Sequence, residues 1–331
     1  MQSLIPYILS ILFGLGLLVV SSNFFVDTTA NIARQYKISP LITGIVIVGF
    51  ATSAPEILVG IDSAIKDRVH IAVGNALGSN IANIGLILGI TALFFPFEVH
   101  SVTIKKIYIL MFISLLIPLF LIWPESDLAL TRYDSIILLS CLVIALFLLI
   151  KIAKNVSGDD PVNSQFSSEL DNATDRSITK LTATLVISFL FMLLGAECLV
   201  KGAVYIAKEF GVSDLIVGLT IVAIGTSLPE TAASITSLIK KKADIAIGNI
   251  IGSNMFNMLA VLGIPAFIRP TSQIDAEILH RDFSVMLFLS VLLAILLFGS
   301  NKVKLSRFNG GILLLCFVAY QFIIYQNAVG S

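Results

Sequence analysis

The chain has 331 residues, of which 57% are hydrophobic and 13% are charged. A soluble domain averages about 45–50% apolar and about 25% charged residues, so this chain has too little charge to cover a water-facing surface. This composition argues against a soluble enzyme or a disordered scaffold, and the balance of 21 basic against 21 acidic residues gives no indication of a nucleic-acid partner.

Charge-free stretches recur along the chain, and they are long enough to cross a membrane. A helix spans the bilayer core with about 17–25 mainly apolar residues, and most of these stretches reach that length with their flanks. The sequence therefore predicts ten membrane-spanning helices. In chain order they are 4–26, 38–62, 70–95, 103–123, 132–153, 180–207, 213–239, 243–268, 282–300 and 309–327.

The segment 155–178 is the most polar part of the chain and contains almost no large apolar residue. Its content of Ser, Asp and Asn is typical of a solvated linker. We predict that it separates two five-helix repeats, residues 1–154 and 179–331.

The two halves are copies of each other. A shift of 174 residues aligns 39–90 with 213–264 without a gap, and roughly half of the aligned positions are identical. The repeat motifs themselves span 44–90 and 218–264. Identical pairs include Gly44/Gly218, Thr52/Thr226, Ser53/Ser227, Pro55/Pro229, Glu56/Glu230, Gly74/Gly248, Asn75/Asn249, Gly78/Gly252, Ser79/Ser253, Asn80/Asn254, Asn83/Asn257 and Gly89/Gly263.

Five helices per copy is an odd number, so the second copy must enter the membrane from the opposite face. The predicted fold is therefore an all-α polytopic membrane protein, with ten transmembrane helices arranged as two inverted five-helix repeats. Helices 2, 3, 7 and 8 carry the motifs and are expected to be discontinuous.

Lys and Arg are distributed unequally between the two faces of this topology. Seven of the 21 flank the face that holds both termini, which leaves 14 for the face that holds the linker. The seven are Lys66, Arg68, Arg132, Lys201, Lys208, Arg269 and Arg281. Because cytoplasmic loops carry the excess of basic residues, the linker 155–178 is predicted to be cytoplasmic and both termini extracellular, in the plasma membrane.

The first motif places a glutamate in the middle of a spanning helix in each repeat. It reads GFATSAPE at 49–56 and AIGTSLPE at 223–230, and ends on Glu56 and Glu230. A carboxylate at the bilayer centre costs roughly 2.5–3.5 kcal/mol on insertion scales. The interiors of the other predicted spans supply no basic partner, so the two glutamates should face a cation or a water-filled cavity.

The residues around each glutamate supply further oxygen atoms. Thr52 and Ser53 lie four and three residues before Glu56, so they share its helical face. Pro55 has no N–H and leaves the Ala51 carbonyl without its helical partner. Hydroxyl, carbonyl and carboxylate oxygens suit a hard cation such as Ca²⁺ or Na⁺, and the lack of nearby Cys or His argues against a soft transition metal.

The second motif is a polar stripe on the helix that follows. It reads GNALGSNIAN at 74–83 and GNIIGSNMFN at 248–257. Its glycines follow the small-xxx-small spacing that allows helices to approach closely. We expect some of its asparagines, Asn75 and Asn80 with their copies, to form hydrogen bonds between helices.

These paired motifs resemble the two α-repeats of the sodium/calcium exchangers, within the calcium/cation antiporter superfamily. The resemblance covers about 39–95 and 213–269. It implies a central site of four cation positions, at which Glu56 and Glu230 bind Ca²⁺ together with backbone carbonyls of Thr52 and Thr226. It also implies that the first and sixth helices slide across the rest as a gate, which gives alternating access. The further residues that it implies for Na⁺ and for the middle of the site are Ser53, Ser79, Ser227, Ser253, the backbone oxygens of Gly49 and Ala223, Asn83 and Asn257.

The sequence departs from the family at one of these positions. Many exchangers carry Asp in one half where this chain has Asn257, so the charge of this site is −2 rather than −3. One Ca²⁺ or two monovalent ions neutralise it, which puts three-for-one exchange in doubt. Two close carboxylates also repel each other and favour protonation of one of them.

The leading hypothesis is a Ca²⁺ antiporter driven by Na⁺, and the main alternative is a proton-coupled exchanger. An uncoupled or non-Ca²⁺ divalent carrier stays open. A cation channel fits the inverted duplication less well than alternating access does. An intramembrane hydrolase would need a His or Lys in the membrane core beside Ser and Glu. We therefore expect no enzymatic activity, no cofactor and no nucleic-acid partner, with Ca²⁺ and Na⁺ as substrates and the lipid bilayer as surroundings.

Overall fold

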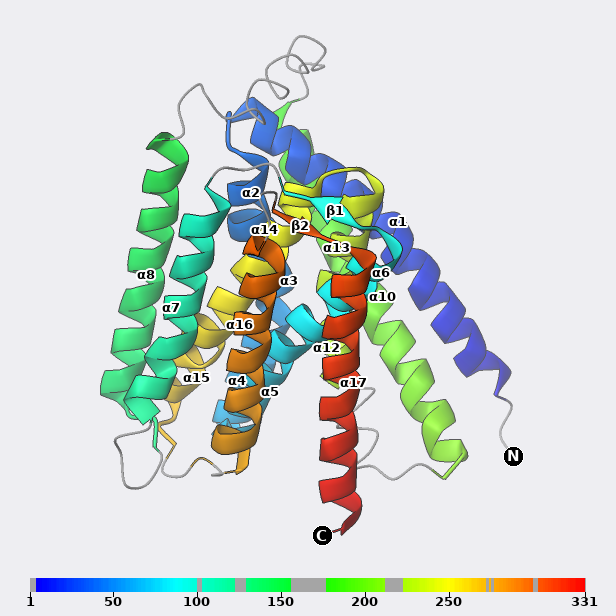
Figure 1. The fold of residues 1–331 in the computed structure, drawn as a ribbon. Helices are drawn as coiled ribbons and strands as arrows, with labels where there is room; N and C mark the ends of the chain where they lie inside the picture. Colours follow the sequence, from blue (N-terminus) through cyan, green and yellow to red (C-terminus); the bar gives the residue numbers. More distant parts are fainter. Residues whose placement is uncertain are drawn as a thin grey trace.

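The computed structural model of this chain describes residues 4–99, 103–122, 129–155, 177–211, 223–271, 274, 277–299 and 303–330. The interior of the predicted linker and the predicted start of the seventh helix, residues 212–222, lie outside the described residues. The described part is almost entirely helical and contains two short strands (Figure 1). The all-α prediction is confirmed.

Nine helical segments of the described chain are long and apolar enough to cross a membrane. They are Ile5–Gln35, Pro40–Ile65, Val69–Phe94, Ile104–Ile122, Arg132–Ile152, Ile178–Glu209, Ala243–Ile268, His280–Phe298 and Arg307–Gln326. Each overlaps one predicted span. The predicted seventh span, 213–239, is described from residue 223 onward, where it is helical except at Ser227.

The second and seventh spans break at equivalent serines of the first motif, Ser53 and Ser227, which agrees with the prediction that these two helices are discontinuous. Pro55 and Pro229 lie at the start of the half-helices that follow, where a residue without an N–H costs no helical hydrogen bond. The half-helices are α3 (Phe50–Thr52) and α4 (Ala54–Ile65) in the second span, and α12 (Ala223–Thr226) and α13 (Leu228–Ile239) in the seventh.

The third and eighth spans change helix type in mid-span instead of breaking in the same way. Both pass through a π-helical segment, a feature that often occurs at functional sites. Their segments are α5 (Val69–Ile81), π-helical Ala82–Leu88 and α6 (Gly89–Phe94), and α14 (Ala243–Phe256), π-helical Asn257–Val261 and α15 (Gly263–Ile268). The second span likewise starts with α2 (Pro40–Thr43) and π-helical Gly44–Gly49.

The first span is longer than the predicted 4–26, because α1 runs from Ile5 to Gln35. The prediction ends the helix before Asp27, the first charged residue of the chain. In the structure Asp27 accepts hydrogen bonds from the ammonium groups of Lys240, at 2.5 Å, and Lys242, at 3.0 Å. Both lysines lie more than 200 residues away in the sequence. Because they pair with Asp27, the helix continues past this charged residue, which the neighbouring sequence alone would suggest as its end.

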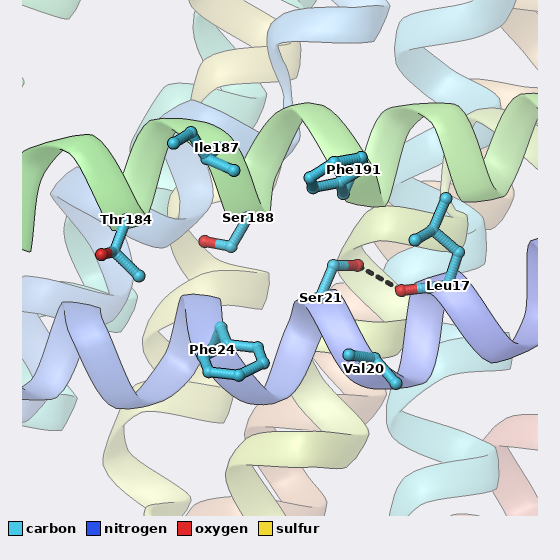
Figure 2. A pocket seen from close by; sticks show the side chains of 8 residues that line it. All are labelled: Leu17, Val20, Ser21, Phe24, Thr184, Ile187, Ser188 and Phe191. Atoms are coloured by element: carbon cyan, nitrogen blue, oxygen red, sulfur yellow. Dashed lines mark hydrogen bonds between the residues drawn. The ribbon is translucent and has the colours of Figure 1, made fainter.

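α1 and α10 (Ile178–Glu209) form a long pair at one side of the bundle (Figure 1). A Cβ atom at Gly14 would lie 2.6 Å from the carbonyl oxygen of Gly195, so the two backbones touch where the helices cross. Beside this crossing an open pocket of about 370 Å³ lies between the two helices (Figure 2). It is lined by Leu17, Val20, Ser21, Phe24, Thr184, Ile187, Ser188 and Phe191. None of these side chains is ionisable, so the pocket is a poor candidate for an ion site.

Short β pairings join loops at the two ends of the bundle. β1 (Phe97–Glu98) pairs antiparallel with β2 (Lys304–Leu305), and a separate bridge joins Leu130 to Thr271. Phe97 and Thr271 are repeat-related positions, so the pairing recurs in inverted form.

α1 begins and α17 ends at the same end of the bundle, as an even number of spans requires (Figure 1). The remaining helices are α7 (Ile104–Ile122), α8 (Arg132–Asn155), π-helical Ile278–Phe283, α16 (Ser284–Phe298) and α17 (Arg307–Gly330).

The eighth span lies at the centre of the molecule, with 89% of its most apolar stretch buried. A Cβ atom at Gly252 would lie 2.6 Å from the carbonyl oxygen of Ile45 and 2.8 Å from its Cα atom, so the second and eighth spans touch through their backbones. The close approach that the small-xxx-small spacing allows is therefore present at Gly252. It is absent at Gly74 and Gly78 in the first repeat, where no described atom lies within 4 Å of such a Cβ atom.

We predict that Gly252→Ala destabilises the protein by about 1–3 kcal/mol, because the added methyl group forces two backbones apart. Thermal unfolding in detergent measures this as a lowered melting temperature. The control is Gly311→Ala in α17, where a Cβ atom meets nothing within 4 Å and the helix propensity of Ala is favourable. Equal melting temperatures for the two variants would contradict the close approach at Gly252.

Candidate cation site

The two mid-helix glutamates occupy equivalent places in the core. Glu56 lies in the first turn of α4 and Glu230 in the first turn of α13, directly after the break in each span. Each residue is 1% exposed. The partial positive charge of a helix N-terminus favours a carboxylate at this position. The two carboxyl groups are also close enough to interact electrostatically, so the fold brings together the two charges that the sequence places in separate repeats.

Seven buried oxygen atoms of the predicted site residues have no hydrogen-bond partner. They are both carboxylate oxygens of Glu56, Oε2 of Glu230, the hydroxyls of Ser53 and Ser227, and the amide oxygens of Asn83 and Asn257. Among the described residues, only five other buried side-chain nitrogen or oxygen atoms lack a hydrogen-bond partner. An unsatisfied buried polar group costs about 1–3 kcal/mol. Because these oxygen atoms are concentrated in the two motifs, they indicate a binding site for a ligand that is coordinated by oxygen.

Thr52 connects the two repeats at this place. Its hydroxyl donates to Oδ1 of Asn249 at 3.0 Å and lies 3.4 Å from the hydroxyl of Ser253. The Ser253 hydroxyl in turn donates to the backbone oxygen of Gly49 at 3.4 Å. Residues of the first motif of one repeat therefore lie against the second motif of the other repeat.

Ten of the twelve predicted site residues are buried in the described structure. The ten are Gly49, Thr52, Ser53, Glu56, Ser79, Asn83, Ser227, Glu230, Ser253 and Asn257. Thr226 ends α12 and is half-buried, and Ala223 begins the same helix, with its backbone alone described. α12 is the first described element of the seventh span.

The predicted inter-helix role of the asparagines is confirmed. Asn75 donates to the backbone oxygen of Glu56 at 3.5 Å, and its copy Asn249 donates to the backbone oxygen of Glu230 at 3.3 Å. Asn249 also donates to the hydroxyl of Ser234 at 3.0 Å. Sequence reasoning did not single out Ser234, although it lies one helical turn after Glu230 and on the same face.

The donor set of this site consists of oxygen atoms. Within the described residues neither glutamate has a basic partner, and no group of three or more His, Cys, Asp or Glu side chains could hold a metal ion. Two carboxylates surrounded by hydroxyl, amide and backbone oxygens are ligands that hard cations prefer. A bound cation would also relieve the repulsion between the two carboxylates.

Comparison with known proteins decides the family. The family model described as "Sodium/calcium exchanger protein" matches residues 6–151 and 180–326, one segment in each repeat. The chain belongs to the sodium/calcium exchanger family. Each matched segment contains one copy of both motifs, and the unmatched residues between the segments fall within and beside the predicted linker.

Relatives of this exchanger span nearly its whole length. CaxA of Alkalimonas amylolytica, which carries the name of an antiporter, is 44% identical over 321 residues, covering 96% of this chain and 98% of CaxA. The sodium/calcium exchanger MaX1 of Methanosarcina acetivorans is 28% identical and covers the same shares. The solved structure of the sodium-calcium exchanger NCX_Mj, soaked with zero Na⁺ and Ca²⁺, superposes with a TM-score of 0.79 at 27% identity, over 96% of this chain and 98% of that one. The protein is therefore a multi-pass membrane antiporter of this family, built from two inverted repeats.

Proposed function

We propose that this antiporter exchanges Ca²⁺ for Na⁺ by alternating access at the site between its two repeats. In this proposal Ca²⁺ binds to the carboxylates of Glu56 and Glu230 and to the backbone oxygens of Thr52 and Thr226. The observation that carries the proposal is the set of seven buried oxygen atoms without partners, five of which belong to carboxylate or amide groups.

Na⁺ ions would occupy flanking positions in the same site. Their ligands would be the hydroxyls of one serine from each motif in each repeat and two backbone oxygens, while the two central asparagines close the middle. These ligands are Ser53, Ser79, Ser227, Ser253, the backbone oxygens of Gly49 and Ala223, Asn83 and Asn257. The hydrogen bond from Ser253 to the Gly49 backbone supports this grouping, because it joins two of these groups from different repeats.

The charge of the site limits the stoichiometry. Asn83 and Asn257 are neutral, so Glu56 and Glu230 contribute −2 in total when both are ionised. One Ca²⁺ or two Na⁺ balance this charge, and a third Na⁺ would leave an uncompensated charge in a medium of low dielectric constant. We therefore propose an exchange of two Na⁺ for one Ca²⁺, without net charge movement.

Uptake of radiolabelled Ca²⁺ into proteoliposomes tests the coupling ion. We expect an outward Na⁺ gradient to drive uptake, and a pH gradient of equal size without Na⁺ to drive none. Uptake that requires only the pH gradient would replace Na⁺ by H⁺ as the coupled ion. Absence of uptake under either gradient would reject Ca²⁺ antiport.

We also propose that the protein lies in the plasma membrane with both termini extracellular and the linker 155–178 cytoplasmic. The two-to-one distribution of Lys and Arg supports this orientation. In a variant without Cys141, Cys198 and Cys316, a cysteine introduced at Ser164 should react with an impermeant maleimide only after the membrane is opened. A cysteine introduced at Ser331 should react in intact cells. The reverse pattern would contradict the proposed orientation.

A further inference from the structure

Four buried asparagines form a hydrogen-bonded cluster between the repeats, beside the candidate site. Asn80 lies in α5 and Asn254 in α14, and Asn83 and Asn257 follow in the adjoining π-helical segments. None of the four is more than 1% exposed. The side-chain amide of Asn257 donates to Oδ1 of Asn80 at 3.0 Å, and that of Asn83 donates to Oδ1 of Asn254 at 3.0 Å. In each repeat, the asparagine at position 80 or 254 therefore accepts a hydrogen bond from the predicted site asparagine of the other repeat, Asn257 or Asn83.

The main chain fixes the direction of the Asn80 amide. Its Nδ2 atom lies 3.3 Å from the backbone carbonyl oxygen of Asn254. A carbonyl oxygen can only accept a hydrogen bond, so the amide group that faces it must be the NH₂ group. The oxygen of Asn80 then necessarily points toward Asn257, where it requires a donor. Nδ2 of Asn80 also contacts the sulfur of Met286 at 3.5 Å, which adds a second acceptor on the same side.

This fixed direction passes on to the next amide. Because Oδ1 of Asn80 can only accept, the atom of Asn257 in contact with it must be Nδ2. The carbonyl oxygen of Asn257 is then turned the other way, and it is one of the seven buried oxygens without a partner. A single backbone carbonyl thus determines that residue 257 presents an oxygen, rather than an NH₂ group, to the candidate site.

We propose that Asn80 is a positioning residue that holds the Asn257 amide with its oxygen toward the transported cation. This inference rests on the proposed function, since it takes Asn257 as a cation ligand. It adds a residue that touches no ion and acts through its partner in the other repeat. Groups that orient a metal ligand in this way are worth about 10- to 100-fold in metal affinity.

The corresponding pair in the other half is held less firmly. Asn254 accepts from Asn83, but its own Nδ2 atom is buried without a hydrogen-bond partner. No carbonyl among the described residues therefore fixes the direction of the Asn254 amide. The two halves of the cluster are related by the repeat, yet only the pair formed by Asn80 and Asn257 is anchored to the main chain.

A double-mutant cycle on Ca²⁺ binding tests the proposal. Calorimetric titration of the purified full chain with Ca²⁺ gives the dissociation constant. We expect Asn80→Leu, which keeps the size of the side chain and removes all three of its hydrogen bonds, to raise the Kd about 10- to 100-fold. In the background of Asn257→Ala the same substitution should change the Kd less than about twofold, because its target is gone.

The matched control cycle uses the ligand that Asn80 does not contact. Asn80→Leu in the background of Asn83→Ala should keep its full effect, because no hydrogen bond joins Asn80 to Asn83. Full effects in both backgrounds would identify Asn80 as a general structural residue and overturn the proposal. A loss of the effect in both backgrounds would also overturn it, since the action of Asn80 would then not pass through Asn257.

Two further measurements keep the outcome decisive. Asn80→Ala replaces Asn80→Leu in both cycles if the leucine variant has a lowered melting temperature, because a smaller side chain cannot overpack the cluster. Unaltered protein that binds no Ca²⁺ would overturn the proposed function together with the role of Asn80. Additive effects in a protein that binds Ca²⁺ would overturn the role of Asn80 alone.

Discussion

Replacement of either central glutamate by glutamine, Glu56→Gln or Glu230→Gln, is expected to reduce Ca²⁺ transport by roughly two to three orders of magnitude. Removal of one partner from a buried charge pair costs about 3–5 kcal/mol, and each 1.4 kcal/mol is worth a factor of about ten in affinity. With one carboxylate left, the site carries −1 and cannot balance a divalent cation in the core. Uptake of radiolabelled Ca²⁺ into proteoliposomes measures the loss.

Asp62→Asn is the matched control for this experiment. Asp62 lies in α4, the same half-helix as Glu56, but its side chain is 61% exposed and pairs with Lys66 at 2.7 Å. An exposed ion pair of this kind contributes about 0–1 kcal/mol, so transport should stay close to that of the unaltered protein. Retained Ca²⁺ transport in Glu56→Gln or Glu230→Gln, or equal loss in Asp62→Asn, would show that these glutamates are not the ligands.

The polar motifs make much of this site predictable from the sequence. Few environments stabilise a glutamate that lies in a spanning helix without a basic partner, and a cation site is one of them. The Ser–x–Pro–Glu pattern marks the region of the helix breaks, which occur at Ser53 and Ser227. The repeat adds the geometry, because an inverted duplication places equivalent residues face to face. For this reason the convergence of Glu56 and Glu230 follows from two motifs and an odd number of helices.

Features that depend on contacts between distant residues could not be predicted in the same way. The extension of α1 through Asp27 requires Lys240 and Lys242, whose approach is visible only in three dimensions. The asparagine pattern indicates hydrogen bonds between helices, but it cannot say which amide faces which. The direction of the Asn80 amide depends on one backbone carbonyl of the opposite repeat.

The substitution Asn257→Asp is expected to make transport sensitive to the membrane potential. The proposed site of the unaltered protein carries −2 when both glutamates are ionised, so the proposed exchange of two Na⁺ for one Ca²⁺ moves no net charge. A third carboxylate raises the charge to −3 and provides for a third Na⁺, so each cycle then moves one charge across the membrane. One elementary charge is worth about 2.3 kcal/mol per 100 mV, which shifts the equilibrium Ca²⁺ ratio about 50-fold.

Asn80 gives this effect a pH dependence of defined sign. Its fixed oxygen accepts a hydrogen bond from residue 257, and a carboxyl group can donate that bond only when it is protonated. At low pH the variant therefore keeps a site charge of −2 and exchanges without net charge movement, whereas at high pH the ionised carboxylate produces the voltage dependence. Ca²⁺ uptake under an imposed K⁺ diffusion potential, measured across a pH series in the variant and the unaltered protein, separates the two states. An unchanged reversal potential at every pH would remove Asn257 from the site and leave Glu56 and Glu230 as its central residues.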